Sequence, residues 1–343
     1  MKISQIAQYV GGAAIAAGAL FIFFRDVNPA MLAQQIAATS PIAIVGACAL
    51  TVVTLFFRAL RWKVMLPRTP GTHTRELFST TMIGFMVNNI LPARIGEAVR
   101  AFFLWKRNGY SLVTAVGSLI AERIIDLFAY SLFFIIPVFT LPQLAHSNAK
   151  IFNLSFGNSL KDGAIFLSAC WGVAGVCLLL YYIKPSVAKA VVKFFLKFVP
   201  GFACKTIRQI LVDLVANLDW IFDLKRVGLV VLLTGAVSFC YPPIVMLLVG
   251  HKAAIGLLGG MFGQAFASLG AAIPLVPGYI GTLHAALSMG LGLVGVDKDT
   301  AKVVAILYHA SGYVTVTVLG LIFFFRSKIS FKDMSGAANS IKK

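Results

Sequence analysis

Residues 88–100 read NNILPARIGEAVR, a polar and broken stretch inside a strongly apolar chain. The stretch contains two asparagines, a proline, a glycine and three charged side chains. A charged group near the centre of a bilayer costs about 2.5–3.5 kcal/mol on insertion scales, so such groups usually line a pathway or a binding site. If the flanking segments are embedded in a membrane, this stretch is the first candidate for the functional site.

The composition of the whole chain is that of a membrane protein. Of its 343 residues, 59% are hydrophobic and 12% are charged, and the mean hydropathy is +0.88. A soluble protein carries about 25% charged residues. Because lipid-exposed backbone must satisfy its own hydrogen bonds, the composition predicts an all-α polytopic membrane protein. Its length allows for about six full spans plus two re-entrant or broken helical hairpins.

The net charge of +18 indicates contact with anionic lipid rather than with nucleic acid. Lysines and arginines cluster at 58–75, at 184–226 and in the tail after 325. By the positive-inside rule these segments, and with them both termini, are cytoplasmic. The five cysteines are scattered without a C-x-x-C or metal-ligand spacing, so we expect them to pack in the interior and expect no metal or other cofactor.

Pro92 divides the polar stretch between two helices that are each too short to cross a bilayer. The segments 77–91 and 94–105 fall below the ~20 residues that a span requires, and basic residues flank both outer ends. The simplest structure is a re-entrant hairpin over 77–105 with its tip near the midplane. Such a break is tolerated only where protein or a watery cavity covers it.

A second broken segment repeats the first one 185 positions later. The pattern P-x-x-I-G begins at Pro92 and again at Pro277, and the same offset aligns Arg123 with Tyr308. An odd number of predicted spans separates the two hairpins, so the second should enter from the opposite face, as in the inverted repeats of many transporters. The predicted organisation is one integral membrane domain over 1–343, with a first repeat at 41–137, cytoplasmic amphipathic helices at 184–226, and a second, inverted repeat at 227–325 whose hairpin covers 254–294.

The helix that starts after the proline break is a predicted anion site. Unpaired N–H groups and the helix dipole favour negative charge there, and Arg94 adds a planar fork suited to phosphate. Glu97 could hold Arg94 or Arg100 in place, and residues 122–126 form a second polar patch at a similar depth. The candidate substrate-binding residues are Asn89, Arg94, Glu97, Arg100, Glu122, Arg123, Asp126 and Tyr308, and the residues at the hairpin breaks are Pro92, Gly96, Pro277, Gly278 and Gly281.

Other interpretations of these polar residues stay open. The charged side chains of 94–126 could form a structural ion network between hairpin and span, which does not exclude transport. Arg100 could extend to the interface. Arg58 and Arg61 are interpreted as topology anchors in a cytoplasmic loop. His309 is either a packed polar residue or a proton relay.

Three motifs occur in a characteristic order: N-x-L-P-x-R-x-G-E-x-x-R from Asn89, E-R-x-x-D from Glu122 and P-G-x-x-G from Pro277. Together they resemble the lysylphosphatidylglycerol synthase transmembrane-region family, over about residues 5–328. The resemblance implies a protein of the bacterial inner membrane that moves lipids or lipid-linked intermediates between leaflets. In the multiple peptide resistance factor, this flippase-like domain is attached to a synthase domain. Only a short basic tail follows Arg326 here, so aminoacyltransferase activity is not expected.

The sequence therefore favours a lipid flippase over two alternatives. The expected cargo is an anionic phospholipid, an aminoacylated lipid or a polyprenyl-phosphate-linked intermediate. One alternative is a membrane-embedded transferase whose carboxylates act as bases. The other is an accessory subunit that recruits a lipid- or glycan-modifying enzyme through 184–226. The expected partners are accordingly membrane lipids with an anionic headgroup, or such an enzyme, and not nucleic acid.

Overall fold

The computed structural model describes most of the chain. Pro92, the greater part of the predicted amphipathic segment 184–226 and most of the predicted first span lie outside the described residues. The described residues are 17–18, 20–21, 23, 29–69, 72–91, 94–145, 150–151, 154–183, 219–273 and 276–327.

Helices make up nearly all of this part of the chain, so the predicted all-α fold is confirmed. The exceptions are two short antiparallel strands, β1 (Lys150–Ile151) and β2 (Leu154–Ser155). The α-helices are α2 (Pro29–Ala37), α3 (Pro41–Met65), α4 (Thr74–Ile90), α5 (Ile95–Asn108), α6 (Leu112–Thr140), α7 (Pro142–Ala145), α8 (Phe156–Ile183), α11 (Leu224–Phe239), α12 (Tyr241–Val249), α13 (Gly256–Ala272), α14 (Thr282–Leu293) and α15 (Lys298–Arg326). The 3-10 turns are η1 (Asp219–Phe222), η2 (Gly250–Lys252) and η3 (Pro277–Tyr279).

Among the described residues, three helical segments are long and apolar enough to cross a membrane. They are α3, α15 and the run Leu224–Lys252, which joins α11, α12 and η2. A helix of 25 residues is about 37 Å long, more than the ~30 Å hydrocarbon core. α6 is also long enough, with 29 residues, but it carries three charged side chains in its middle.

Two pairs of short helices form the broken hairpins. α4 and α13 have 17 residues each, α5 has 14 and α14 has 12, all below the ~20 that a span requires. α4 packs against α5, and α13 packs against α14. Arg94 and Tyr279, which lie at equivalent positions of the two breaks, both have a left-handed backbone, with φ of 52° and 59°. This shared conformation supports the repeat, whose inverted orientation stays a prediction.

Local chemistry explains where several helices begin and end. The side chains of Ser111, Asp223 and Asp297 accept hydrogen bonds from the first backbone N–H groups of α6, α11 and α15. The pair Pro242–Pro243 lacks backbone N–H groups and stands at the start of α12, so α11 ends at Phe239. The candidate span Leu224–Lys252 is therefore assigned as two α-helices and a 3-10 turn.

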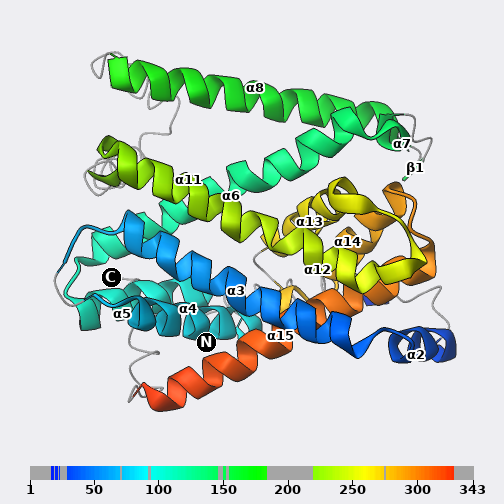
Figure 1. Ribbon diagram of the computed structural model, residues 1–343, viewed down its shortest axis with the longest axis horizontal. Coiled ribbons are helices and arrows are strands. Elements are labelled where there is room, and N and C mark those ends of the chain that lie inside the picture. The colour runs from blue at the N-terminus through cyan, green and yellow to red at the C-terminus, as the bar shows by residue number, and fades with distance from the viewer. Residues whose placement is uncertain are drawn as a thin grey trace, which may run out of the picture.

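The long helices enclose the two hairpins (Figure 1). α3 packs against α4, α11, α12 and α15, while the second hairpin packs against α6, α12 and α15. α8 lies at the edge of the molecule, next to α6 and α7 (Figure 1). The charged middle of α6 thus faces α3, α5 and α11, and Glu122 and Asp126 are buried there.

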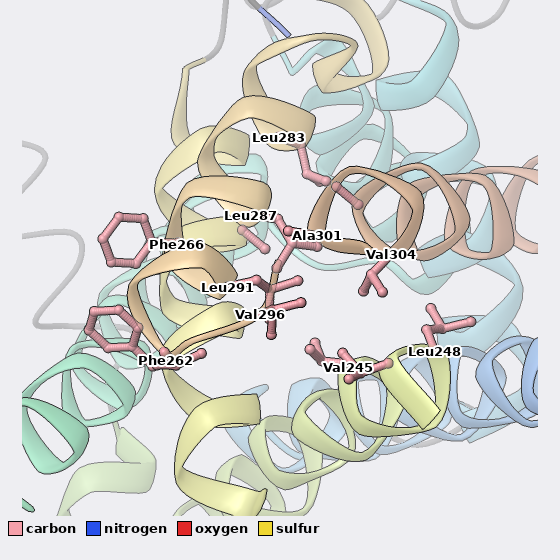
Figure 2. Packing of buried hydrophobic residues seen from close by; sticks show 14 of the residues in the cluster. Val245, Leu248, Phe262, Phe266, Leu283, Leu287, Leu291, Val296, Ala301 and Val304 are labelled. Carbon is pink, nitrogen blue, oxygen red and sulfur yellow. The ribbon is translucent and has the colours of Figure 1, made fainter. Parts of the chain in front are cut away.

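The largest hydrophobic cluster lies where the second hairpin meets α12 and α15. Figure 2 shows Val245 and Leu248 of α12 beside Leu287 and Leu291 of α14, with Val304 of α15 between these helices. In a bilayer, packing of this kind stabilises the fold by close dispersion contacts, because lipid tails are as apolar as leucine. This cluster packs against one side of the second hairpin. The apex of that hairpin, residues 277–281, faces the first hairpin, since η3 packs against α4.

Candidate functional site

A connected network of ion pairs lies between α3, α5 and α6. Its centre is formed by Glu122 and Asp126, which are one turn apart on the same face of α6; their side chains are 0% and 6% exposed. Nη1 of Arg58 lies 2.6 Å from Oδ2 of Asp126 and 3.3 Å from Oε1 of Glu122. Nη2 of Arg61 lies 2.7 Å from Oδ1 of Asp126. Two arginines of α3 thus bind the carboxylates of α6.

Arg100 reaches the same carboxylates from α5. Its Nη1 and Nη2 lie 3.2 and 2.9 Å from Oε1 and Oε2 of Glu122, a bidentate pair. Its guanidinium carbon lies 4.3 Å from the ring centre of Trp62, in a cation–π contact. The Arg100 side chain is only 2% exposed, so the interpretation that it extends to the interface is wrong.

Arg58 and Arg61 are the candidate residues that sequence reasoning missed. They were assigned to a cytoplasmic loop, but α3 continues to Met65 and both side chains are buried. Arg58 also donates to the hydroxyl of Tyr130 at 2.9 Å, and Arg61 donates to that of Thr234 at 3.2 Å. The available signal was their i, i+3 spacing on one face of an uninterrupted helix, in a chain with few membrane-embedded carboxylates to pair with.

Three further charged side chains form the partly exposed edge of the network. Arg94, Glu97 and Arg123 are 29%, 27% and 29% exposed. Arg123 binds Glu122 and lies 3.4 Å from Asp126, and its Nε lies 3.7 Å from Oε1 of Glu97. The same Glu97 oxygen lies 4.0 Å from Nη1 of Arg94. Glu97 therefore stands between two arginines, and its predicted contact with Arg94 is present while Arg100 pairs with Glu122 instead.

Arg94 also joins the apex of the first hairpin to the second hairpin. Its Nη2 donates to the carbonyl of Ala271 at 2.8 Å, in the last turn of α13. Carbonyl groups at a helix C-terminus carry partial negative charge, which stabilises a guanidinium there. The Arg94 guanidinium also lies 6.0 Å from the ring centre of Tyr279, in the break of the second hairpin.

The predicted break residues bring backbone into close contact. The N–H of Gly96 donates to Oδ1 of Asn88 at 2.7 Å, and a Cβ at Gly96 would collide with the carbonyl oxygen of Gly84. In the second hairpin, Pro277 begins η3 and is followed by glycines 278 and 281, which have positive φ angles of 56° and 90°. A Cβ at Gly278 would lie 2.9 Å from the carbonyl oxygen of Asn89. The two apices therefore touch at a point where no side chain fits.

The structure separates Asn89 and Tyr308 from the ion network. The amide of Asn89 donates to the hydroxyl of Thr317 at 3.0 Å and to the carbonyl of Tyr313 at 3.3 Å, so it holds α4 against α15. The hydroxyl of Tyr308 donates to Oε1 of Gln264 at 2.5 Å, between α15 and α13. The other predicted binding residues lie together.

The network carries more positive than negative charge. Its connected ion pairs, as far as the chain is described, contain five arginines and three carboxylates, a surplus of two positive charges. The Nε–H groups of all five arginines are buried and have no hydrogen-bond acceptor among the described residues, and of these arginines Arg94 and Arg123 are the partly exposed ones. Uncompensated charge is costly at membrane depth. The partly exposed edge is therefore suited to accept an anion.

Comparison with known proteins agrees with this architecture. Residues 9–320 match the family described as the lysylphosphatidylglycerol synthase TM region. The chain is 25% identical to a UPF0104 membrane protein of Methanocaldococcus jannaschii over 240 residues, which are 70% of this chain and 93% of that protein. It is 24% identical to the glycosyltransferase AglD of Haloferax volcanii over 341 residues, covering 93% of this chain but 54% of AglD. On the family match over most of its length, the chain belongs to the lysylphosphatidylglycerol synthase transmembrane-region family of membrane proteins.

Proposed function

We propose that this protein moves an anionic lipid between the leaflets of a membrane. The observation that carries the proposal is the surplus of two positive charges in the ion network, with Arg94 and Arg123 at its partly exposed edge. This edge lies beside the apices of two short hairpins, the place where transporters with broken helices hold their cargo.

The arginines of the network would have two different roles, either binding the headgroup or holding α6 in position. A phosphate oxygen entering between Arg94 and Arg123 would replace the carboxylate of Glu97, which lies at long range from both arginines, 4.0 and 3.7 Å away. Guanidinium groups bind phosphate in a bidentate way, so Arg94 and Arg123 supply the donors. Arg58 and Arg100 hold α6 in position through their ion pairs with Asp126 and Glu122. Because these carboxylates already match their charges, the two arginines do not bind the headgroup. The lipid tails stay in the bilayer.

The chemical class of the cargo is a phosphate-bearing lipid whose headgroup has a net negative charge. Anionic phospholipids meet this requirement, and so do polyprenyl-phosphate sugars. One relative is named a glycosyltransferase, which places sugar-carrying lipid phosphates in the set to be tested first.

A second candidate function follows from the same relative. The chain spans about half the length of AglD, so a related membrane region occurs within a longer protein named a glycosyltransferase. In this alternative, the chain is the membrane partner of a lipid- or glycan-modifying enzyme and moves no lipid by itself.

The test is lipid movement by the purified protein in liposomes. Fluorescent phosphatidylglycerol, phosphatidylcholine and a polyprenyl-phosphate sugar are each compared for access to a membrane-impermeant quencher. We expect the protein to move a phosphate-bearing anionic lipid faster than phosphatidylcholine, and Arg94→Gln and Arg123→Gln to reduce that rate at least tenfold.

Arg68→Gln is the matched control, because the Arg68 side chain is 85% exposed and 3.9 Å from its carboxylate partner. Equal rates in the wild type and both network variants, with thermal unfolding unchanged, would contradict the proposed binding site. No movement of any lipid by folded wild-type protein would favour the partner function instead.

A further inference from the structure

A pair of hydrogen-bonded histidines connects the apex of the second hairpin to α15. Nδ1 of His309 and Nε2 of His284 lie 2.9 Å apart, and their ring centres are 4.7 Å apart. The backbone N–H of Gly281 donates to Nδ1 of His284 at 3.3 Å. The backbone of Gly278 is hydrogen-bonded to His309. Both histidines thus bind the same four-residue turn, one from α14 and one from α15.

The hydrogen bonds determine where the protons of the neutral pair lie. Because Gly281 donates to Nδ1 of His284, that ring carries its proton on Nε2 and donates it to Nδ1 of His309. His309 then carries its proton on Nε2, because its Nδ1 is the acceptor. Two neutral imidazoles have two acceptor nitrogens between them, and both are occupied.

A third ring proton therefore cannot be added without breaking one of these bonds. A proton on Nδ1 of His284 would face the N–H of Gly281, and a proton on Nδ1 of His309 would face the N–H of His284. The first change breaks the bond between the turn and His284, and the second breaks the bond between His284 of α14 and His309 of α15, so either one interrupts the chain of bonds from Gly281 to α15. The same turn contains Gly278, whose backbone touches the carbonyl of Asn89 at the end of α4. Protonation would loosen the contact between the two hairpin apices.

Charged and titratable groups lie near the histidine pair on several elements. On α15, the ring of Tyr313 packs on His309. Lys302 lies 5.8 Å from the ring centre of Phe23, which in turn packs on His284. At the apex, Arg94 lies over the ring of Tyr279, with Glu97 behind it at 4.0 Å. α13 contributes no ionisable side chain.

Arg94 contacts Tyr279, which belongs to the same turn that the two histidines bind. An anionic headgroup bound at Arg94 would lie beside this turn and would stabilise a positive charge on the histidines, so anion and proton favour each other's binding by reciprocal linkage.

We propose that the His284–His309 pair is a proton-binding site that couples lipid movement to proton movement in the same direction. The inference rests on the proposed lipid transport and adds its energy source. One proton entering from one side binds with one headgroup, loosens the apex contact, and leaves with the headgroup on the other side. The pair then returns to its neutral, fully hydrogen-bonded state.

The first experiment compares proteoliposomes with and without an imposed pH difference. Fluorescent phosphatidylglycerol is followed by quenching, and a pH-sensitive dye inside the vesicles reports proton uptake. We expect a drop of one pH unit on the donor side to accelerate lipid entry several-fold, with proton uptake that depends on the lipid. The double variant His284→Asn/His309→Gln keeps hydrogen-bond acceptors at both positions but cannot take up a proton, and we expect it to lose both responses.

His251→Gln is the control, because His251 is an exposed residue of η2, and it should keep both responses. Lipid movement that is equally fast at all pH differences in the wild type would overturn the coupling while leaving the transport function intact. A double variant that still responds to pH like the wild type would overturn the role of this pair.

A second measurement does not require transport. Amide hydrogen exchange of the peptide that contains Gly281 is compared between pH 8 and pH 5 after correction for intrinsic exchange, in protein supplied with phosphatidylglycerol. We expect exchange at the start of α14 to increase at low pH in the wild type and to stay constant in the double variant. Constant exchange in the wild type would overturn the proton site even if no lipid movement is detected, so this proposal and the transport function fail separately.

Discussion

Glu122 binds arginines from three helices at once. Its side chain is fully buried, receives a bidentate pair from Arg100, and lies within 4.0 Å of Arg58 and Arg61 as well as in contact with Arg123. A single carboxylate therefore holds α3 and α5 against α6. The physical reason is that a buried guanidinium at membrane depth requires a charged acceptor, and this chain has few acidic residues to supply one.

Replacing Glu122 by glutamine should destabilise the protein severely. The substitution preserves the shape of the side chain but leaves buried arginines without their anion, and breaking a buried ion pair costs about 3–5 kcal/mol. Thermal unfolding in detergent should therefore shift to a much lower temperature. Glu76→Gln is the matched control, because Glu76 is exposed, and it should change stability by less than about 0.5 kcal/mol. Equal stability of the two variants would show that the network does not hold the helices together.

The first hairpin depends on the close approach of two glycine backbones. Gly96 lies against Gly84, and its N–H is bound by Asn88. Gly96→Ala should destabilise the protein by about 3 kcal/mol, because the clash is with backbone that cannot move aside. Gly292→Ala is a matched control in α14, since a Cβ there meets nothing within 4 Å, and helix propensity should make it neutral or stabilising. Thermal unfolding of both variants checks this, and a tolerated Gly96→Ala would contradict the described hairpin.

The start of α15 contributes a pH-dependent stabilisation outside the membrane. Partial burial acts to raise the pKa of Asp297, but hydrogen bonds from Thr300 at the first turn of α15 outweigh it and hold the pKa below its usual value. The ionised carboxylate is therefore favoured by folding. This stabilisation is present above the pKa of the unfolded chain and is lost as the pH falls through the lower pKa of the folded protein.

Asp297→Asn should consequently lower the melting temperature near neutral pH and have a smaller effect at pH values below the pKa of the folded carboxyl. Asparagine keeps the ability to cap the helix, so the variant removes the charge and not the cap. Melting curves between pH 7 and pH 3 test this. A difference between wild type and variant that is constant over this range would contradict the assignment.

At the scale of the whole molecule, proton coupling has a consequence for the driving force. A singly charged headgroup moving alone carries charge, and the membrane potential contributes about 2.3 kcal/mol per charge per 100 mV. One proton moving with one such headgroup carries no net charge. The lipid distribution should then follow an imposed pH difference, by about tenfold per pH unit, and should not follow an imposed potassium diffusion potential. A response to the potential alone would show that the headgroup crosses without a proton.

Much of the architecture can be predicted from the chain itself. Apolar runs of sufficient length identify α3 and α15, and the proline and glycine breaks mark two hairpins whose helices are too short to span. These features are local, because helix length and backbone breaks depend on a few consecutive residues. The same reasoning places Arg94, Glu97, Glu122 and Asp126 at membrane depth, where charge is rare.

The sequence by itself thus determined an all-helical membrane protein with charged residues in its interior. Only the tertiary structure decided which charges meet. It brought Arg58 and Arg61 from the assumed loop into the network, turned Arg100 inward, and moved Tyr308 away. It also joined His284 to His309. These pairings involve residues far apart in the chain, so they depend on how helices rotate and pack, and helical periodicity within one segment carries no information about a partner in another.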